Sequence, residues 1–292
     1  MHAASPTRAR SHRIRRVLPS MRALLALFSV LTALAVGALY VLAEHTDRYF
    51  AWTIQPPLTA AFLGAGYAAG FVLVVLSLRD PVWAHSRVAV LTILAFVVLT
   101  TIATLVHIDR FHFMGEFADS GFIAIAAAWF WLAVYLVVPV LMLALLLPQE
   151  RSRGVDPPPR HPVPLWLRIA LAAESVVLTL TGAALYLAPA TAERIWPWTL
   201  TPLTARVVAA WLVAFGLATG LAAFSGDLRR LRTAAIAYTV FGVLVIGAQL
   251  RFFSAIDWNA LPTIAFALTS VAVVVTGAVG WRLAPSPRRF RR

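Results

Sequence analysis

The stretch Arg48-Tyr49-Phe50-Ala51-Trp52-Thr53-Ile54 recurs later in the chain as Arg194-Ile195-Trp196-Pro197-Trp198-Thr199-Leu200. Two shorter stretches recur at the same spacing: Ala38-Leu39-Tyr40 as Ala184-Leu185-Tyr186, and Pro57-Leu58-Thr59-Ala60 as Pro202-Leu203-Thr204-Ala205. The offset is 146 residues and falls to 145 after one extra residue in the first copy. A chain that repeats itself in this way is expected to fold as two copies of one structural unit.

Each copy consists of long apolar stretches. Hydrophobic residues make up 61% of the chain and charged residues 13%, and the mean hydropathy is +0.81. About 20 apolar residues cross a bilayer, and in lipid such a segment satisfies its backbone hydrogen bonds as a helix. The sequence therefore predicts an all-α polytopic membrane protein with eight transmembrane helices. The expected spans are 21–43, 58–78, 87–107, 121–147, 165–188, 203–224, 232–250 and 261–283.

Five segments follow from the spans. They are a basic tail (1–20), a first four-helix repeat (21–148), a proline-rich linker (149–166), a second four-helix repeat (167–285) and a second basic tail (286–292). Because each repeat has an even number of helices, both enter the membrane in the same orientation. We therefore expect two parallel repeats related by an axis along the membrane normal.

The charge distribution sets the expected orientation. The chain has a net charge of +13, no lysine and 25 arginines. All but five of these lie on the side of the two tails; the exceptions are Arg48, Arg110, Arg194, Arg206 and Arg251. This positive-inside pattern predicts cytoplasmic termini, with the arginine runs at 8–16 and 288–292 against anionic lipids. The use of arginine for every basic residue, together with much alanine, indicates a GC-rich bacterial genome, so we expect a bacterial plasma membrane. Charge placed in this way argues against nucleic-acid binding.

The strongest matches between the copies lie in the loops opposite the tails. Arg110-Phe111, followed by Glu116-Phe117, also matches Arg251-Phe252, followed by Asp257-Trp258. One interpretation is structural, because tryptophan and tyrosine favour the membrane interface and exposed ion pairs fasten loops. The other is a pocket at the outer leaflet for an amphiphile with an anionic head, which arginine binds through bidentate donors. Its candidate residues are Arg48, Trp52, Arg110, Glu116, Arg194, Trp198, Arg251, Asp257 and Trp258.

Polar side chains within the spans are few. Glu174 is the only acid in a span, and its equivalent in the first copy is Phe28. An intramembrane carboxyl indicates a proton relay or a substrate contact, or else an acid hydrogen-bonded to Ser175, Thr181 or a neighbouring helix. Thr104 and its equivalent Gln249 favour interhelical hydrogen bonds, or a polar lining of the proposed pocket.

Metal, cofactor and catalytic motifs are not apparent. His45, His107 and His112 lie near acids but lack the spacing of metal ligands on a helix face, so we expect no metal site and no cofactor. The absence of cysteine excludes disulfides and thiol catalysis. We find no phosphate-binding glycine loop and no nucleophile elbow, so nothing argues for an enzyme.

The stretch Thr204–Gly216, in which Arg206 precedes small residues and Gly216, resembles the second helix of the DoxX-like superfamily of bacterial membrane proteins. The first copy departs from this pattern because Ala61 stands where Arg206 does. The resemblance implies a four-helix unit, and it implies a fold more than a function.

Three hypotheses for function remain. The leading one is a binding protein with an outer-leaflet pocket for a lipid-like molecule. The alternatives are a proton-coupled transporter of small solutes that uses Glu174, and a membrane scaffold subunit without a ligand. The first depends on the outer arginines, the second on Glu174 and the third on neither.

Overall fold

The helices of the structure are those that the apolar stretches predict. The computed structural model describes residues 13–117 and 119–285. Within them, eight helices are long and apolar enough to cross a membrane, which confirms the predicted all-α fold with eight spans. They are α1 (Pro19–Val36, continued by a π-helical turn, Gly37–Val41), α3 (Pro57–Arg79), α4 (Trp83–Val106), α5 (Phe122–Glu150), α6 (Leu165–Leu187), α8 (Pro202–Ser225), α9 (Leu228–Arg251) and α10 (Leu261–Leu283).

Local sequence sets several helix ends. Pro57 and Pro202 are the first residues of α3 and α8, where the fixed φ of proline suits the first turn. Gly226 ends α8 with a φ of 69°, a left-handed conformation that glycine adopts without strain. The recurring loops contain two short helices that the apolar pattern does not predict, α2 (Thr46–Tyr49) and α7 (Ala192–Ile195).

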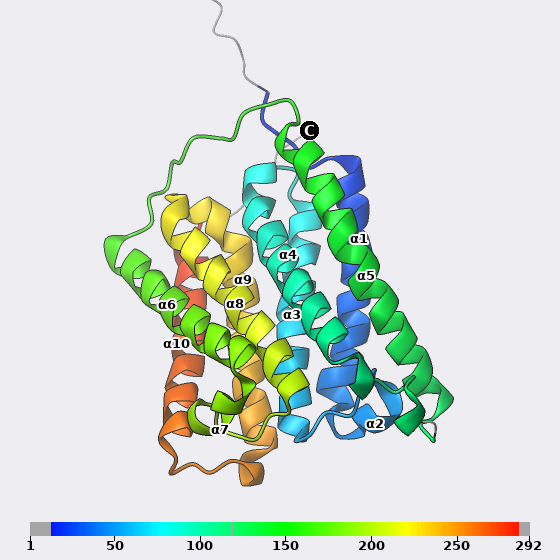
Figure 1. Cartoon of the computed structure of the whole chain (residues 1–292). Coiled ribbons are helices and arrows are strands. Elements are labelled where there is room, and N and C mark those ends of the chain that lie inside the picture. The colour runs from blue at the N-terminus through cyan, green and yellow to red at the C-terminus, as the bar shows by residue number, and fades with distance from the viewer. Residues whose placement is uncertain (1–12, 118, 286–292) are drawn as a thin grey trace, which may run out of the picture.

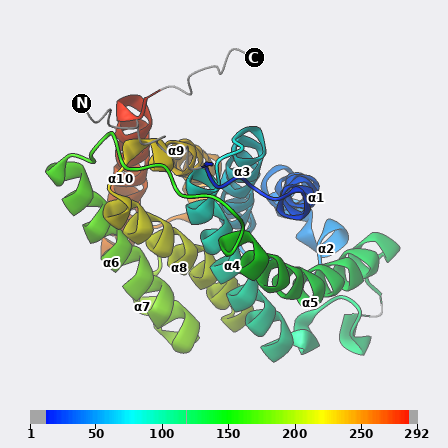
Figure 2. The ribbon, with the colours of Figure 1, turned by 90° about the horizontal axis from the view of Figure 1, so that it is seen from above.

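Four inner helices form the centre of the bundle, and four outer helices cover them (Figures 1 and 2). Across the centre, α3 packs against α9 and α4 packs against α8. On the outside, α1 covers α3, α5 covers α4, α6 covers α8 and α10 covers α9. The most apolar windows of α3 and α8 are 72% and 67% buried, whereas those of α1 and α6 are each 22% buried. The outer helices therefore present most of the surface that contacts lipid.

Equivalent helices of the two predicted copies occupy equivalent places in this bundle. The inner pairs α3–α9 and α8–α4 correspond to each other, as do the outer helices α1 and α6, and α5 and α10. This is the packing that a twofold relation between the copies would produce. The parallel repeat arrangement itself stays a prediction.

One end of the bundle, which we call the termini face, carries both described ends of the chain (Figure 1). The opposite end, the loop face, carries α2 and α7. Which face is cytoplasmic stays a prediction. Of the arginine runs that we expect near anionic lipids, residues 8–12 and 288–292 lie outside the described residues.

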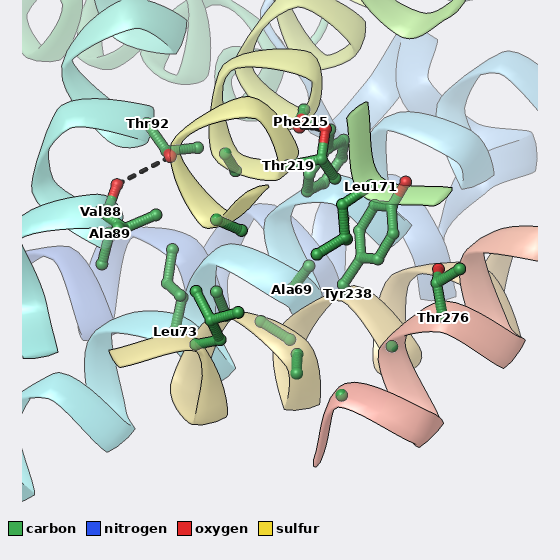
Figure 3. A pocket seen from close by; sticks show the side chains of 18 of the residues that line it. Ala69, Leu73, Val88, Ala89, Thr92, Leu171, Phe215, Thr219, Tyr238 and Thr276 are labelled. Atoms are coloured by element: carbon green, nitrogen blue, oxygen red, sulfur yellow. Dashed lines mark hydrogen bonds between the residues drawn. The ribbon is translucent and has the colours of Figure 1, made fainter. Parts of the chain in front are cut away.

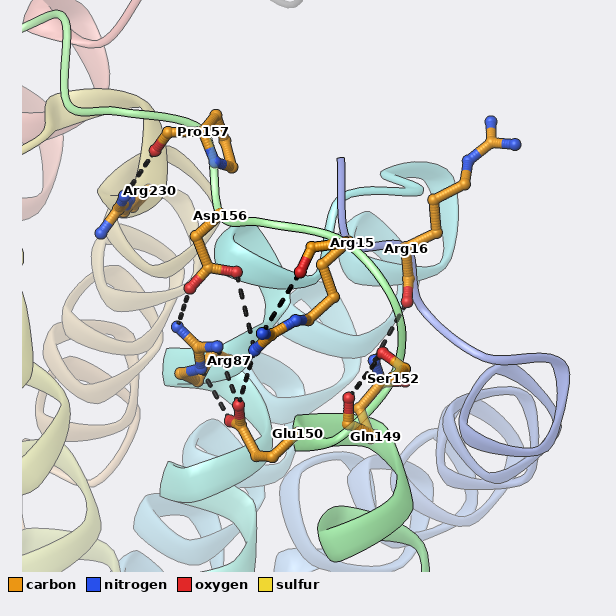
Figure 4. Close-up of polar contacts among 10 residues, drawn as sticks. Arg15, Arg16, Arg87, Gln149, Glu150, Ser152, Asp156, Pro157 and Arg230 are labelled. Carbon is orange, nitrogen blue, oxygen red and sulfur yellow. Dashed lines mark hydrogen bonds and ion pairs between the residues drawn. The ribbon is translucent and has the colours of Figure 1, made fainter. Parts of the chain in front are cut away.

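An ion-pair cluster ties the termini face together (Figure 4). Arg87 of α4 binds Glu150 at the end of α5 through two hydrogen bonds of 2.7 and 2.8 Å, and Asp156 of the linker at 2.6 Å. Arg15 reaches the same Glu150 at 3.3 Å. Backbone pairing adds to these contacts, because the Arg15 N–H donates to the Val155 carbonyl and the Val17 N–H to the Pro81 carbonyl. The segment that precedes α1 is thereby fixed to the linker between the two halves.

Candidate functional site

The predicted arginines of the loop face lie apart, and three of them have partners of their own. Arg48 and Arg110 are exposed and pair with the adjacent acids Asp47 and Asp109, at 3.7 and 2.9 Å. Arg194 is exposed on α7. Within the described residues, these arginines do not converge on a shared pocket.

Arg251 is the predicted arginine with the widest contacts. Its guanidinium donates to the Tyr40 carbonyl at 2.8 Å and to Glu44 at 3.2 Å, and lies 4.9 Å from the centre of the Phe252 ring. These bonds join the end of α9 to the end of α1. The other predicted members of this loop stay local: Asp257 accepts from the Asn259 N–H, and the Trp258 indole donates to the Phe253 carbonyl. Glu116 is exposed in the corresponding loop of the first half.

Trp52 and Trp198 are buried beneath the loops, 2% and 7% exposed. Trp52 packs edge-on against Trp131 of α5, with ring centres 5.0 Å apart. Trp198 packs against Phe266 of α10, and its indole N–H donates to the Thr59 hydroxyl of α3 at 2.8 Å. The two tryptophans thus anchor the loops to the helices and are not offered to a ligand from solution.

A cavity lies within the first half, between α1, α3, α4 and α5, and is bordered by Trp211 of α8; we call it the lateral cavity. Its volume is about 290 Å³. Two of its lining residues, Leu34 of α1 and Phe130 of α5, are 58% and 51% exposed on the outer surface. The cavity therefore opens sideways between α1 and α5, which make few contacts with each other. Its other lining residues include Ala35, Ala38, Tyr49, Tyr67, Phe96, Ala127, Trp131 and Tyr135.

The lateral cavity is lined mainly by apolar side chains. The hydroxyls of Tyr67 and Tyr135 hydrogen-bond to each other at 2.5 Å between α3 and α5, and both residues are buried. Because two hydroxyls share this one bond, one of their two O–H groups is left without an acceptor among the described residues. The indole of Trp131 donates to the Thr104 hydroxyl of α4 at 3.0 Å. An apolar guest would leave both of these hydrogen bonds in place.

The second half has a smaller cavity of about 130 Å³ between α6, α8, α9 and α10. Trp196 and Phe266 take up part of this space, with ring centres 5.1 Å apart. Near it, the Gln249 side chain donates to the Ser270 hydroxyl at 3.2 Å. Thr104 and Gln249 therefore both make interhelical hydrogen bonds, as their matching positions favour.

A third space, which we call the central cavity, is shown in Figure 3. It has a volume of about 60 Å³, and its lining includes Thr92 of α4, Phe215 and Thr219 of α8, and Tyr238 of α9. The Thr92 hydroxyl donates to the Val88 carbonyl of its own helix. Trp211 of α8 borders both the central and the lateral cavity, so its ring stands between them.

Trp211 is held by aromatic neighbours. Its ring stacks on Phe96 with centres 3.8 Å apart, and it meets Tyr67 edge-on at 5.3 Å. Its indole nitrogen is buried without a hydrogen-bond partner in the described part of the chain. Gly66 allows this contact, because a Cβ there would lie 2.6 Å from the indole ring.

Glu174 of α6 forms hydrogen bonds to two other helices. Its carboxylate accepts from the Tyr238 hydroxyl of α9 at 3.1 Å and from the Thr276 hydroxyl of α10 at 2.9 Å. Both donors line the central cavity, and Figure 3 shows their side chains. The sequence leaves two interpretations of Glu174 open. Hydrogen bonds to neighbouring helices are one of them. The other, a proton relay or a substrate contact, requires contact with a cavity.

Sequence reasoning did not single out Tyr67, Tyr135 or Trp211. All three lie deep in apolar spans, where an aromatic side chain is most often core. Their position in the spans is a signal that could have identified them. Tyrosine and tryptophan favour the ends of membrane spans, whereas these three residues lie near the middle.

Comparison of the chain with models of protein families, with curated proteins and with solved structures gives no match in any of the three. The resemblance to the DoxX-like superfamily stays a prediction.

Proposed function

We propose that this membrane-embedded protein binds a lipid-like amphiphile and holds its apolar chain in the lateral cavity. The observation that carries the proposal is the sideways opening between α1 and α5, at the exposed residues Leu34 and Phe130. A chain dissolved in the bilayer could enter there without crossing water. The volume of about 290 Å³ is close to the lower end of the range for ligand pockets.

The position of the polar head follows from the ends of the cavity. Tyr49 and Phe50 close the cavity at the loop face, and Arg48 is the residue next to Tyr49. Arg48 is exposed and its pair with Asp47 is long, at 3.7 Å. An anionic head beside Arg48 would gain a charge-assisted hydrogen bond from the guanidinium. We place the loop face at the outer leaflet of a bacterial plasma membrane, with cytoplasmic termini, on the positive-inside pattern.

The experiment is native mass spectrometry of the protein purified in mild detergent, with identification of any bound molecule. Ala127 lines the lateral cavity, whereas its neighbour Ala126 is exposed on the same helix. We expect Ala127→Phe to fill the cavity and remove the bound species, and the matched control Ala126→Phe to retain it. A protein that carries no ligand would contradict the proposal and favour a scaffold. Equal retention in both variants would show that the ligand is not held in the lateral cavity.

A second function is favoured by the surroundings of Glu174. A carboxylate bonded to two residues that line a membrane cavity is placed to exchange a proton with that cavity. The test is proton flux into proteoliposomes that contain a pH-sensitive dye, after an imposed pH gradient. A proton path through Glu174 predicts flux that Glu174→Gln removes and that Glu116→Gln, a change of an exposed loop acid, leaves intact. Flux equal to that of empty liposomes would exclude proton conduction through the protein alone.

A further inference from the structure

Arg206 has a setting unlike that of the other arginines of the loop face. It is the fifth residue of α8, within a membrane span, and it is partly exposed. In Figure 2, α8 lies between α6 and α4, and it packs closely on both. Arg206 therefore lies between the ends of α4 and α6, and we call this part of the surface the Arg206 site.

The hydrogen-bond partner of Arg206 is a histidine. Its guanidinium donates to the His107 ring nitrogen Nε2 at 2.6 Å. Burial, followed by the Arg206 charge, holds the pKa of His107 below its usual value, so the ring is neutral and can accept the bond. Arginine stays protonated and has five N–H donors. The pair therefore carries a positive charge with donors left over.

Among the described side chains, no carboxylate lies within ion-pair distance of Arg206. The equivalent position of the first half, between α1 and α9, is different. Ala61 stands at the position of Arg206, and the arginine present there, Arg251, is already bound to Glu44 and to the Tyr40 carbonyl. Within the described side chains, the arginine of the first half is therefore paired with a carboxylate and Arg206 is not.

The surface near the Arg206 site suits a lipid. Towards the end of α4, Ile102, Leu105 and Val106 are 46%, 48% and 58% exposed, and Leu187 at the end of α6 is 80% exposed. The two helices are joined by Tyr186 of α6, whose hydroxyl donates to the Leu99 carbonyl of α4 at 2.7 Å. An anion at Arg206 would thus sit at the membrane interface with apolar surface directly below it.

We propose that Arg206, positioned by His107, binds the phosphate group of an anionic lipid at the Arg206 site between α4 and α6. The site is separate from the lateral cavity and does not depend on it. The guanidinium offers paired N–H donors to two phosphate oxygens, and the acyl chains lie along the exposed face of α4. Inorganic phosphate from solution has the same chemistry, and the experiment separates the two sources.

The experiment counts bound lipids by native mass spectrometry while phosphatidylglycerol or phosphatidylcholine is titrated onto the protein in mild detergent. We expect Arg206→Gln to weaken binding of one phosphatidylglycerol about tenfold, the scale of one charge-assisted hydrogen bond. Arg251→Gln, which removes an arginine that is already paired, is the matched control and should bind as the wild type does. Phosphatidylcholine binding should not change.

His107 supplies a second variant in case Arg206→Gln does not fold. His107→Glu places a carboxylate beside the guanidinium and should compete with the lipid, whereas His107→Gln keeps a neutral acceptor and should not. Ala127→Phe should leave this binding intact, so failure of the lateral cavity and failure of this site are distinguishable. Equal phosphatidylglycerol binding by the wild type, Arg206→Gln and His107→Glu would overturn the proposal. Binding of millimolar inorganic phosphate without any preference for phosphatidylglycerol would overturn the lipid assignment.

Discussion

The Tyr186 hydroxyl of α6 donates a hydrogen bond to the Leu99 carbonyl of α4, and so joins the second half of the chain to the first. The equivalent residue Tyr40 of α1 makes the reciprocal bond, to the Leu244 carbonyl of α9 at 3.0 Å. The tyrosines are 146 residues apart and the leucines 145, which are the offsets of the sequence repeat. The two bonds support the twofold relation between the halves, because each half gives one hydroxyl and receives one.

We predict that Tyr40→Phe and Tyr186→Phe each lower the free energy of unfolding by about 0.6 kcal/mol, the average for interhelical hydrogen bonds in a membrane. Tyr49→Phe is the control, because no hydrogen bond of the Tyr49 hydroxyl is formed in the described residues. Denaturant unfolding in mild detergent measures all three. A loss in the control as large as in the two variants would show that the cross-half bonds contribute nothing specific.

Arg87 is expected to stabilise the termini face more than any exposed arginine does. Its replacement in Arg87→Gln leaves Glu150 and Asp156 without the guanidinium that lies between them, both in partly buried positions. We predict a loss of about 1–2 kcal/mol, since hydrogen bonds to charged groups exceed exposed ion pairs. Arg79→Gln, at an exposed site, should be close to neutral. The unfolding midpoints of both variants at low and high salt check this, and the difference should shrink at high salt.

Gly64 permits the closest approach between α1 and α3. A Cβ at Gly64 would lie 2.6 Å from the Tyr40 backbone nitrogen, and backbone cannot move aside as a side chain end can. We predict that Gly64→Ala destabilises the protein by about 1–3 kcal/mol through overpacking. Gly37→Ala, on α1 itself, meets nothing within 4 Å and should be neutral or slightly stabilising. Thermal unfolding of the two variants compares them, and an equal effect would refute the close contact.

We predict that the loop face becomes less stable in mild acid because of His112. The ring is 2% exposed, its Nδ1 donates to the Phe50 carbonyl and its Nε2 accepts from the Thr53 hydroxyl, so it is held in the neutral form. Burial lowers the pKa of His112, although the Phe50 bond opposes this. The unfolded chain therefore binds the proton more readily, and stability that is full above about pH 6.5 is lost as the pH falls below it.

The measurement is the unfolding midpoint of the wild type and His112→Gln between pH 8 and pH 5. We expect the wild-type midpoint to fall with pH and the variant to lose part of this dependence. The pKa of His107 is also lowered, so this residue contributes in the same direction. A variant with the full wild-type dependence would show that His112 is not responsible.

The sequence predicted the spans well because their signal is local. The predicted span 58–78 corresponds to the observed helix Pro57–Arg79, and the predicted span 203–224 to Pro202–Ser225. These bounds agree because the length of an apolar stretch and a proline at its start are visible in the local sequence. The duplication also predicted which side chains have equivalents. Short helices such as α2 were not predicted, because four residues give no periodicity.

The cavities and the polar pairs could not be predicted in the same way. The lateral cavity exists because α1 and α5, neighbours of α3 and α4, do not close on each other, and apolar composition does not determine that distance. Arg206 and His107 are 99 residues apart in sequence, and only the packing of α4 on α8 brings them together. The sequence groups the outer arginines because they recur in both copies. Recurrence means that they occupy equivalent positions in the two halves, and these positions lie apart.

The contact between the segment before α1 and the linker has a consequence for how the protein is made. The Leu18 N–H donates to the Gln149 side chain, a residue synthesised 131 positions later. When α1 is inserted, the partner of its first turn has not yet been translated. The segment before α1 can therefore form this hydrogen bond only after α5 has been completed. The first half completes its packing at the stage when the second half begins to emerge from the ribosome.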